Sequence, residues 1–153
     1  MGVTKWLKNL FAFAPGDPLV SIVFLLREHR TLTEPAVMLA ANRAWGEGTY
    51  TVEWPRLRRG GREWIMQSMV GMFTEDLQSK AKTGEDTKAV RAHRGWWSID
   101  LQSGAADAEA YQQMGVLMAA LLNANCLAVY YPQSEGLYAV DSETGIRMLD
   151  GLR

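Results

Sequence analysis

The two histidines, His29 and His93, come closest to a metal-binding pattern in this sequence. Each lies at the end of a predicted strand, and Glu28, Glu53 or Asp100 could add a carboxylate. Two histidines and one carboxylate with open positions typically hold iron or zinc. Isolated histidines near strand ends are more often structural, and this spacing has no specificity of its own. We retain His29 and His93 as candidate metal ligands and otherwise expect no cofactor.

Aromatic side chains on predicted strands form the candidate ligand-binding surface. They are Trp54, Trp64, Trp96, Tyr130 and Tyr138. A sheet that presents them on its helix-free side would offer a concave wall for a small apolar or cationic ligand. Core packing and an interface between two copies of the chain are the alternatives for the same side chains.

The basic cluster consists of Arg56, Arg58, Arg59 and Arg62. Tryptophans flank it, and such alternation of charge with aromatics is typical of proteins that bind single-stranded nucleic acid. A solvated hairpin tip is the simpler interpretation, because the net charge of −1 creates no field that would recruit a polyanion. We therefore expect no nucleic-acid partner.

Motifs of the common enzyme classes are absent from the sequence. It has no GxSxG, no HExxH, no phosphate-binding loop of the GxxxxGK type and no EF-hand loop. The single cysteine, Cys126, cannot form an intrachain disulfide and is expected to be a buried, inert thiol in a reducing, cytoplasmic setting. We therefore expect a non-enzymatic interaction or binding protein that forms a homodimer. The alternatives are a small-molecule-binding module with an aromatic-lined cleft and a metal-dependent enzyme.

The elements that would position these residues follow from hydrophobic periodicity and turn signals. With 153 residues and 48% apolar side chains, the chain can form a single core. The predicted elements are a strand at 19–26, a helix at 34–45, a hairpin of strands 49–54 and 62–70 around Gly60 and Gly61, a strand at 94–101, a helix at 105–123, strands at 126–131 and 137–140, and a short final helix within 142–152.

This order repeats strand, helix, strand, strand, and predicts an α+β fold. Two βαββ units, in a ferredoxin-like or a duplicated βαββ arrangement, would form an antiparallel sheet with helices on one face. The single domain spans 15–153 and carries a mobile loop at 74–88, where the composition is polar.

The strand at 19–26 is apolar at both alternating sets of positions, so both of its faces should be covered. An amphipathic N-terminal segment, 1–14, or a second copy of the chain could cover the face that lacks helices. The same segment could instead bind a membrane surface. No stretch is apolar for the roughly 18 residues that a membrane-spanning helix needs, so we expect no integral membrane protein.

Two stretches of the sequence resemble a family of bacterial domains of unknown function. In Ser21–Gly46 a strand that ends in a charged residue leads into an Ala-rich helix closing on Trp-Gly, and His93–Leu101 is a strand preceded by His-Arg. The resemblance implies an α+β fold and carries no known catalytic residues. The element order also resembles the duplicated βαββ modules of small-molecule-sensing domains of the gyrase-inhibitor type.

Overall fold

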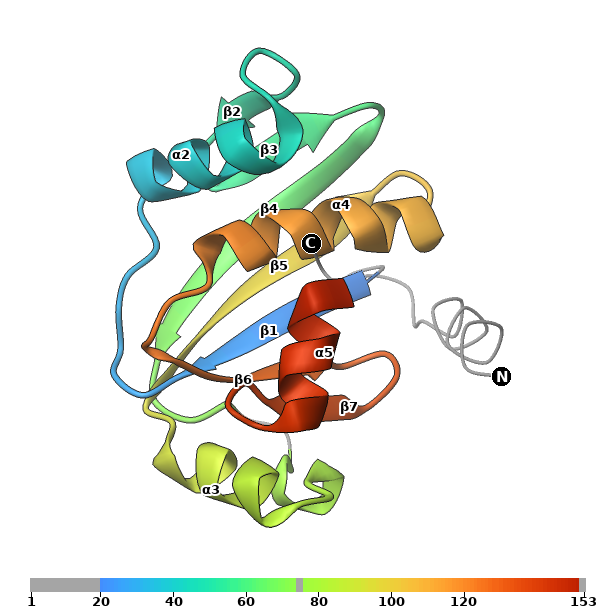
Figure 1. Cartoon of the computed structure of the whole chain (residues 1–153). Helices are drawn as coiled ribbons and strands as arrows, with labels where there is room; N and C mark the ends of the chain where they lie inside the picture. Colours follow the sequence, from blue (N-terminus) through green and yellow to red (C-terminus); the bar gives the residue numbers. More distant parts are fainter. Residues whose placement is uncertain (1–19, 74–75, 152–153) are drawn as a thin grey trace.

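The computed structural model describes residues 20–73 and 76–151, which form an α+β fold (Figure 1). The strands are β1 (Val20–Leu26), β2 (Thr51–Glu53), β3 (Arg56–Arg59), β4 (Arg62–Val70), β5 (Gly95–Ser103), β6 (Cys126–Tyr131) and β7 (Gly136–Ala139). The helices are α2 (Glu34–Trp45), α3 (Gly84–Ala92), α4 (Ala108–Leu121) and α5 (Glu143–Gly151), with a 3₁₀ turn, η1, at Gln78–Lys80. The predicted α+β class is confirmed, whereas the N-terminal segment 1–14 lies outside the described residues.

All seven strands belong to one antiparallel sheet, in the order β2-β3-β4-β5-β1-β6-β7. The first strand lies in its interior, between β5 and β6. Phe24 is opposite Trp97 on one side and Val129 on the other. Every residue of β1 is buried, which confirms that its continuous apolar pattern marks a strand covered on both faces.

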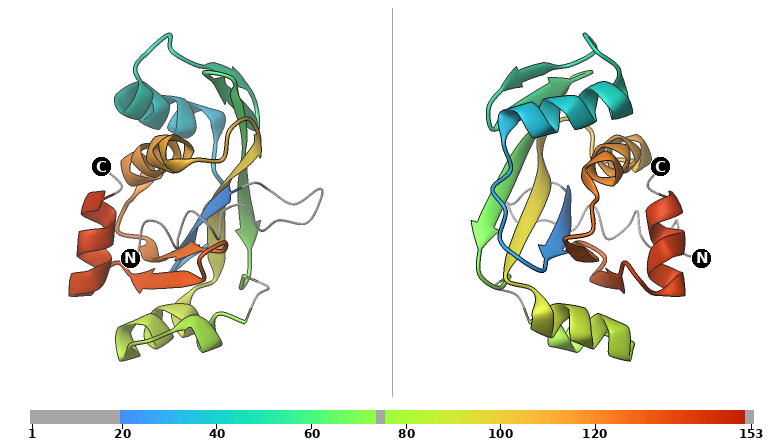
Figure 2. Two further views of the ribbon diagram at one scale, coloured as in Figure 1. Left: turned by 90° about the vertical axis from the view of Figure 1, so that its right-hand side faces the viewer. Right: turned by 60° about the vertical axis from the view of Figure 1, so that its left-hand side comes forward.

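Helices α2 and α4 lie side by side on one face of the sheet (Figure 2). The Thr33 hydroxyl accepts a hydrogen bond from the Ala36 N–H and caps α2. The core beneath the two helices combines Ile22 and Phe24 of β1 with Met114 and Leu117 of α4. This face therefore holds the larger core of the domain.

The opposite face is covered in part by α3, so the expectation that all helices lie on one face is wrong. Ala89 and Val90 of α3 pack with Val23 and Leu25 of β1, which point away from α2 and α4. Leu77, ahead of the 3₁₀ turn, joins the same cluster. This second cluster accounts for the burial of the other side of β1.

Much of the segment 74–88, expected to be a polar loop, instead forms η1 and the first half of α3. The Thr83 hydroxyl accepts from the Asp86 N–H and caps α3. Asp86 is itself buried, because its carboxylate accepts hydrogen bonds from the backbone N–H groups of Lys82 and Ala139 at 3.2 and 3.0 Å. A contact with distant β7 thus orders a helix whose own apolar face is short.

The predicted hairpin around Gly60 and Gly61 contains an additional strand. β2 pairs with β3, and β3 pairs with β4, so β2 does not contact β4 directly. Pro55 lies in the turn between β2 and β3, after a cis peptide bond, and ends β2 because proline has no N–H to donate. Leu57 of β3 is fully buried and holds the added strand on the core.

Truncation of neighbouring β1 residues should test whether both faces contribute to stability. We expect Phe24→Ala and Leu25→Ala to lower the free energy of unfolding by about 3–5 and 2–5 kcal/mol, because both side chains are fully buried in different clusters. Met38, which is exposed, is the matched control. Met38→Ala should change the free energy of unfolding by less than about 0.5 kcal/mol. Denaturant unfolding measures the free energy of unfolding of all three variants. If Leu25→Ala leaves it unchanged, the apolar cluster on the α3 face does not contribute to stability.

Candidate functional site: an arginine-lined pocket

The candidate metal ligands His29 and His93 both lie among the described residues, and their role in metal binding stays a prediction. No group of three or more His, Cys, Asp and Glu side chains there could hold an ion. The Phe73 N–H donates to Nε2 of His93 at 2.9 Å, and Nδ1 of the same ring bonds the Val90 carbonyl. Both nitrogens of His93 are therefore occupied by backbone groups, which assigns the proton of the neutral ring to Nδ1.

Burial lowers the pKa of His93; the hydrogen bond to Val90 opposes this effect and the charge of Arg94 adds to it. The unfolded chain, with a histidine pKa of about 6.5, consequently takes up a proton first as the pH falls. The contribution of His93 to the free energy of unfolding is thus complete above pH of about 6.5 and declines as the pH drops toward the folded-state pKa. The neutral ring is the form that the backbone contacts require.

Replacing His93 should flatten this pH dependence. We expect His93→Gln to lower stability at pH 8, because two buried backbone contacts are lost or weakened, and to lose less additional stability than the parent between about pH 7.5 and 5. Urea unfolding across this range measures both effects. His29→Gln is the control, and flattening of the profile by that variant alone would contradict the assignment.

The five candidate aromatic residues divide between the two faces of the sheet. Trp64 is fully buried in the core under α2 and α4, and Trp54 and Tyr138 pack against that core. Trp96 and Tyr130 lie on the other face, where Phe73 contacts both rings at centroid distances of 4.9 and 5.8 Å. They do not share one wall, and their role in ligand binding stays a prediction.

Asp100, which the sequence suggested only as a possible metal ligand, is a buried carboxylate on the face of the sheet opposite α2 and α4. Asp100 accepts hydrogen bonds from the Ser21 and Ser98 hydroxyls and from the Gln67 amide. Burial raises its pKa, although the bonds from Ser21 and Ser98 act in the opposite direction. These hydrogen bonds explain how a carboxylate can be buried at this position of the sheet.

Cys126 is buried, as predicted. Burial raises the pKa of its thiol to about 11, against a smaller opposing effect of a backbone hydrogen bond at Asn123. A thiol with such a pKa is protonated at neutral pH and is a poor nucleophile. The cysteine therefore contributes packing to β6.

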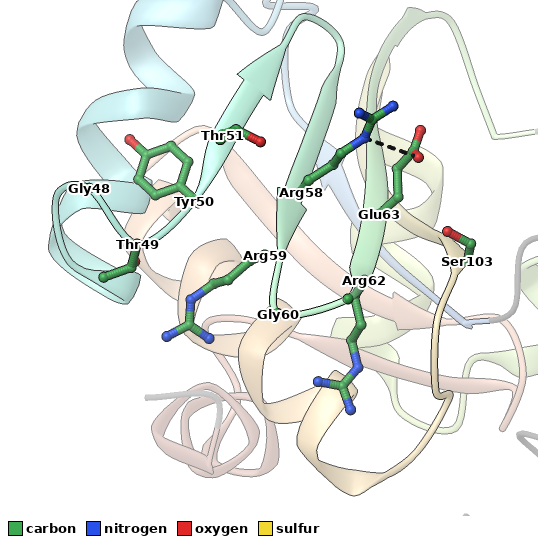
Figure 3. Close-up of a pocket in the computed structure, with 11 residues that line it drawn as sticks. Gly48, Thr49, Tyr50, Thr51, Arg58, Arg59, Gly60, Arg62, Glu63 and Ser103 are labelled. Carbon is green, nitrogen blue, oxygen red and sulfur yellow. Dashed lines mark hydrogen bonds and ion pairs between the residues drawn. The ribbon is translucent and has the colours of Figure 1, made fainter.

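A pocket with a volume of about 500 Å³ lies at the turn between β3 and β4 and is lined by Arg58, Arg59 and Arg62 (Figure 3). Gly60 and Gly61 form the two-residue turn, with positive φ angles of 55° and 81° that favour glycine. Arg59 and Arg62 are paired across this turn, so their side chains leave the same face of the hairpin. Figure 3 shows Arg58 on the other face, beside Glu63.

Arg62 is buried and serves to attach the hairpin to the start of α4. Its guanidinium donates to the Ala105 carbonyl and to the Asp107 carboxylate, both at 2.9 Å, and to Gln113 at 3.5 Å. Asp107 also caps α4. Gly104 permits this close approach, because a Cβ there would lie 2.7 Å from Arg62 Cγ. These contacts engage all three nitrogens of Arg62.

The arginines of the solvent face are paired with glutamates. Glu63 accepts a hydrogen bond from Arg58 at 3.3 Å and forms an ion pair with Arg56 at 3.2 Å, and Glu53 lies 3.8 Å from Arg58. Both arginines are at least half exposed, so these pairs contribute little to stability. This part of the cluster matches the solvated hairpin tip that the sequence predicts.

Arg59 is the cation of the pocket that has no carboxylate partner among the described residues. Its guanidinium carbon lies 5.6 Å from the centroid of the Trp45 ring, in cation–π contact, and its buried Nε has no hydrogen-bond partner. Trp45 is fixed by a 2.9 Å hydrogen bond from its indole to the Gln113 carbonyl. Stacking thus holds Arg59 in place without using its hydrogen-bonding capacity.

The sequence showed the arginine cluster but could not separate these roles. Arg62 is distinguished from Arg59 by Asp107, which lies 45 residues further along the chain. Binding of single-stranded nucleic acid would also require exposed aromatic rings on which bases can stack. Trp64, which follows the arginine cluster in the sequence, is fully buried and cannot provide one. The two-glycine turn was the available signal for placing Arg59 and Arg62 on one face.

Loss of the Arg62 contacts should destabilise the domain. We expect Arg62→Met to lower the free energy of unfolding by about 2 kcal/mol or more, because hydrogen bonds to charged groups typically contribute about 1.5–3 kcal/mol. Arg56→Met, on the solvent face, should cost less than about 1 kcal/mol. Chemical denaturation compares the two, and equal effects would show that Arg62 is not an anchor.

Comparison with known proteins identifies no relative of this chain. No protein-family model, no curated protein and no solved structure matches the chain. Within the described residues, no helix is long and apolar enough to cross a membrane.

Proposed function

We propose that the protein is a non-enzymatic binding protein and that the pocket at the β3–β4 turn receives an anionic group of its ligand. The observation that carries the proposal is Arg59, a half-buried guanidinium stacked on Trp45 without a carboxylate partner among the described residues. A guanidinium held by a cation–π contact can still donate N–H groups to a carboxylate or phosphate. Arg59 is therefore the expected ligand contact, and Arg62 the support beneath it.

The other lining residues favour binding over catalysis. Glu63 is held by Arg56 and Arg58, so its two carboxylate oxygens are already engaged. Tyr50 also lines the pocket, and its pKa is raised by burial and by the charge of Glu47, so its hydroxyl stays protonated at neutral pH. The volume of about 500 Å³ falls within the range of small-molecule sites.

We further infer that the central strands form a ferredoxin-like core rather than a duplicated βαββ arrangement. The units β1-α2-β4 and β5-α4-β6 each leave a gap of one strand, and the first strand of the other unit fills that gap. Two equivalent βαββ units would use their hairpins alike. Here the hairpin β3–β4 joins the centre through its second strand and β6–β7 through its first, which supports the ferredoxin-like alternative.

The homodimer and the cytoplasmic location expected from the sequence stay predictions. Three apolar side chains at the end of β4 and just beyond it, Met69, Val70 and Met72, are about half exposed or more. An association between copies would be compatible with such side chains. The anion-binding proposal does not depend on it.

Binding of simple oxyanions tests the proposed function. We expect saturable binding of inorganic pyrophosphate or succinate in calorimetric titrations at low salt, with a change in the Arg59 Nε–H signal in NMR spectra. Arg59→Gln should weaken this binding at least tenfold. Arg56→Gln removes one charge from the same hairpin outside the pocket lining, and should weaken it less than twofold.

Two results would contradict the proposal. One is the absence of saturable binding for both anions. The other is an equal loss in Arg59→Gln and Arg56→Gln, which would indicate attraction by the overall charge of the hairpin rather than a specific contact.

A further inference from the structure

We propose a second binding site, in the cleft between α3 and β6, for a small zwitterion of the α-amino acid type, because Arg27, Lys88, Glu85 and Asp141 line this cleft without pairing with one another. The cleft has a volume of about 470 Å³ and shares no residue with the arginine-lined pocket. In Figure 1 α3 lies at the opposite end of the molecule from β2 and β3. The two sites are therefore independent.

The walls of the cleft come from segments far apart in the sequence. Helix α3 contributes Ala89 and Ala92, β6 contributes Leu127, and Val140 follows β7. These side chains supply an apolar floor for the body of a ligand. Sites for small molecules commonly combine such a floor with a few polar groups that set orientation.

The walls are joined by a buried contact that keeps the cleft in shape. Asp86 of α3 accepts a hydrogen bond from the Ala139 N–H of β7 at 3.0 Å. Its other carboxylate oxygen accepts from the Lys82 N–H, just before the helix. The contact between Asp86 and Ala139 fixes α3 to β7. Because α3 and the residues that follow β7 both line the cleft, the cleft would be largely preformed.

The charges around the cleft are balanced, with two cations and two anions. Within the described chain, none of these four side chains takes part in an ion pair or a side-chain hydrogen bond. All four are exposed, and some exposed charges elsewhere do pair, as Arg30 does with Glu28 at 3.0 Å. Unpaired charges of both signs are complementary to a ligand that carries both.

An α-amino acid fits this arrangement. Its carboxylate would bind between Arg27 and Lys88, and its ammonium group would bind Asp141 or Glu85. Its side chain would rest on the apolar floor. A ligand with a single charge would leave one pair of lining charges unsatisfied, so both charges of the amino acid should be needed.

The experiment uses the twenty proteinogenic amino acids as probes. We expect at least one of them to bind the full-length protein saturably in calorimetry after a thermal-shift screen. Its N-acetyl and C-amide derivatives, which each lack one charge, should bind at least tenfold more weakly. No binding by any amino acid, or equal binding by a singly charged derivative, would overturn the proposal.

Variants on the cleft rim locate the site. Lys88→Gln and Asp141→Asn should each weaken binding at least fivefold. Arg91→Gln is the matched control, because Arg91 lies on the same helix, is exposed and does not line the cleft. Equal weakening by Arg91→Gln would overturn the assignment. The same titrations in the Arg59→Gln background remove the proposed carboxylate contact of the arginine-lined pocket. Amino-acid binding that persists in that background belongs to the cleft, so failure of one proposed site is distinguishable from failure of the other.

Discussion

Burial of β1 on both faces is the constraint on which the rest of the structure depends. A seven-residue strand without an exposed side chain requires a strand on each edge and a layer on each face. β5 and β6 are the strands on its two edges. Helices α2 and α4 cover one face, and α3 with the residues before it covers part of the other face.

That arrangement leaves the two ends of the molecule available for binding. At one end, beyond the main core, β2, β3 and the start of β4 extend the sheet and carry the arginine-lined pocket. At the other end, α3 contacts β6 and β7 and borders the cleft between α3 and β6. Each site is held by one buried charged residue with several partners, Arg62 in the first case and Asp86 in the second.

The pocket illustrates how one turn assigns different roles to similar residues. Four arginines lie within seven positions, yet they differ in what they contact. Pairing across Gly60 and Gly61 places Arg59 and Arg62 on one face. The two arginines then differ in whether a carboxylate lies within ion-pair distance. Arg62 meets Asp107, whereas Arg59 meets the face of Trp45. The contacts of Arg62 hold the hairpin on α4, whereas Arg59 keeps the donors that the proposed ligand would use.

Elements whose signals are local could be predicted from the sequence. The apolar run of β1 and the Thr33 cap with Glu34 and Pro35 define a strand and a helix through interactions within a few residues, so their bounds could be predicted closely. Tertiary structure decided the rest. Asp86 is buried because Ala139 lies beside it, and Arg59 differs from Arg62 because Asp107 reaches only one of them. These contacts join residues about 50 positions apart, so no pattern within a short stretch of sequence records them, and only the folded sheet brings them together.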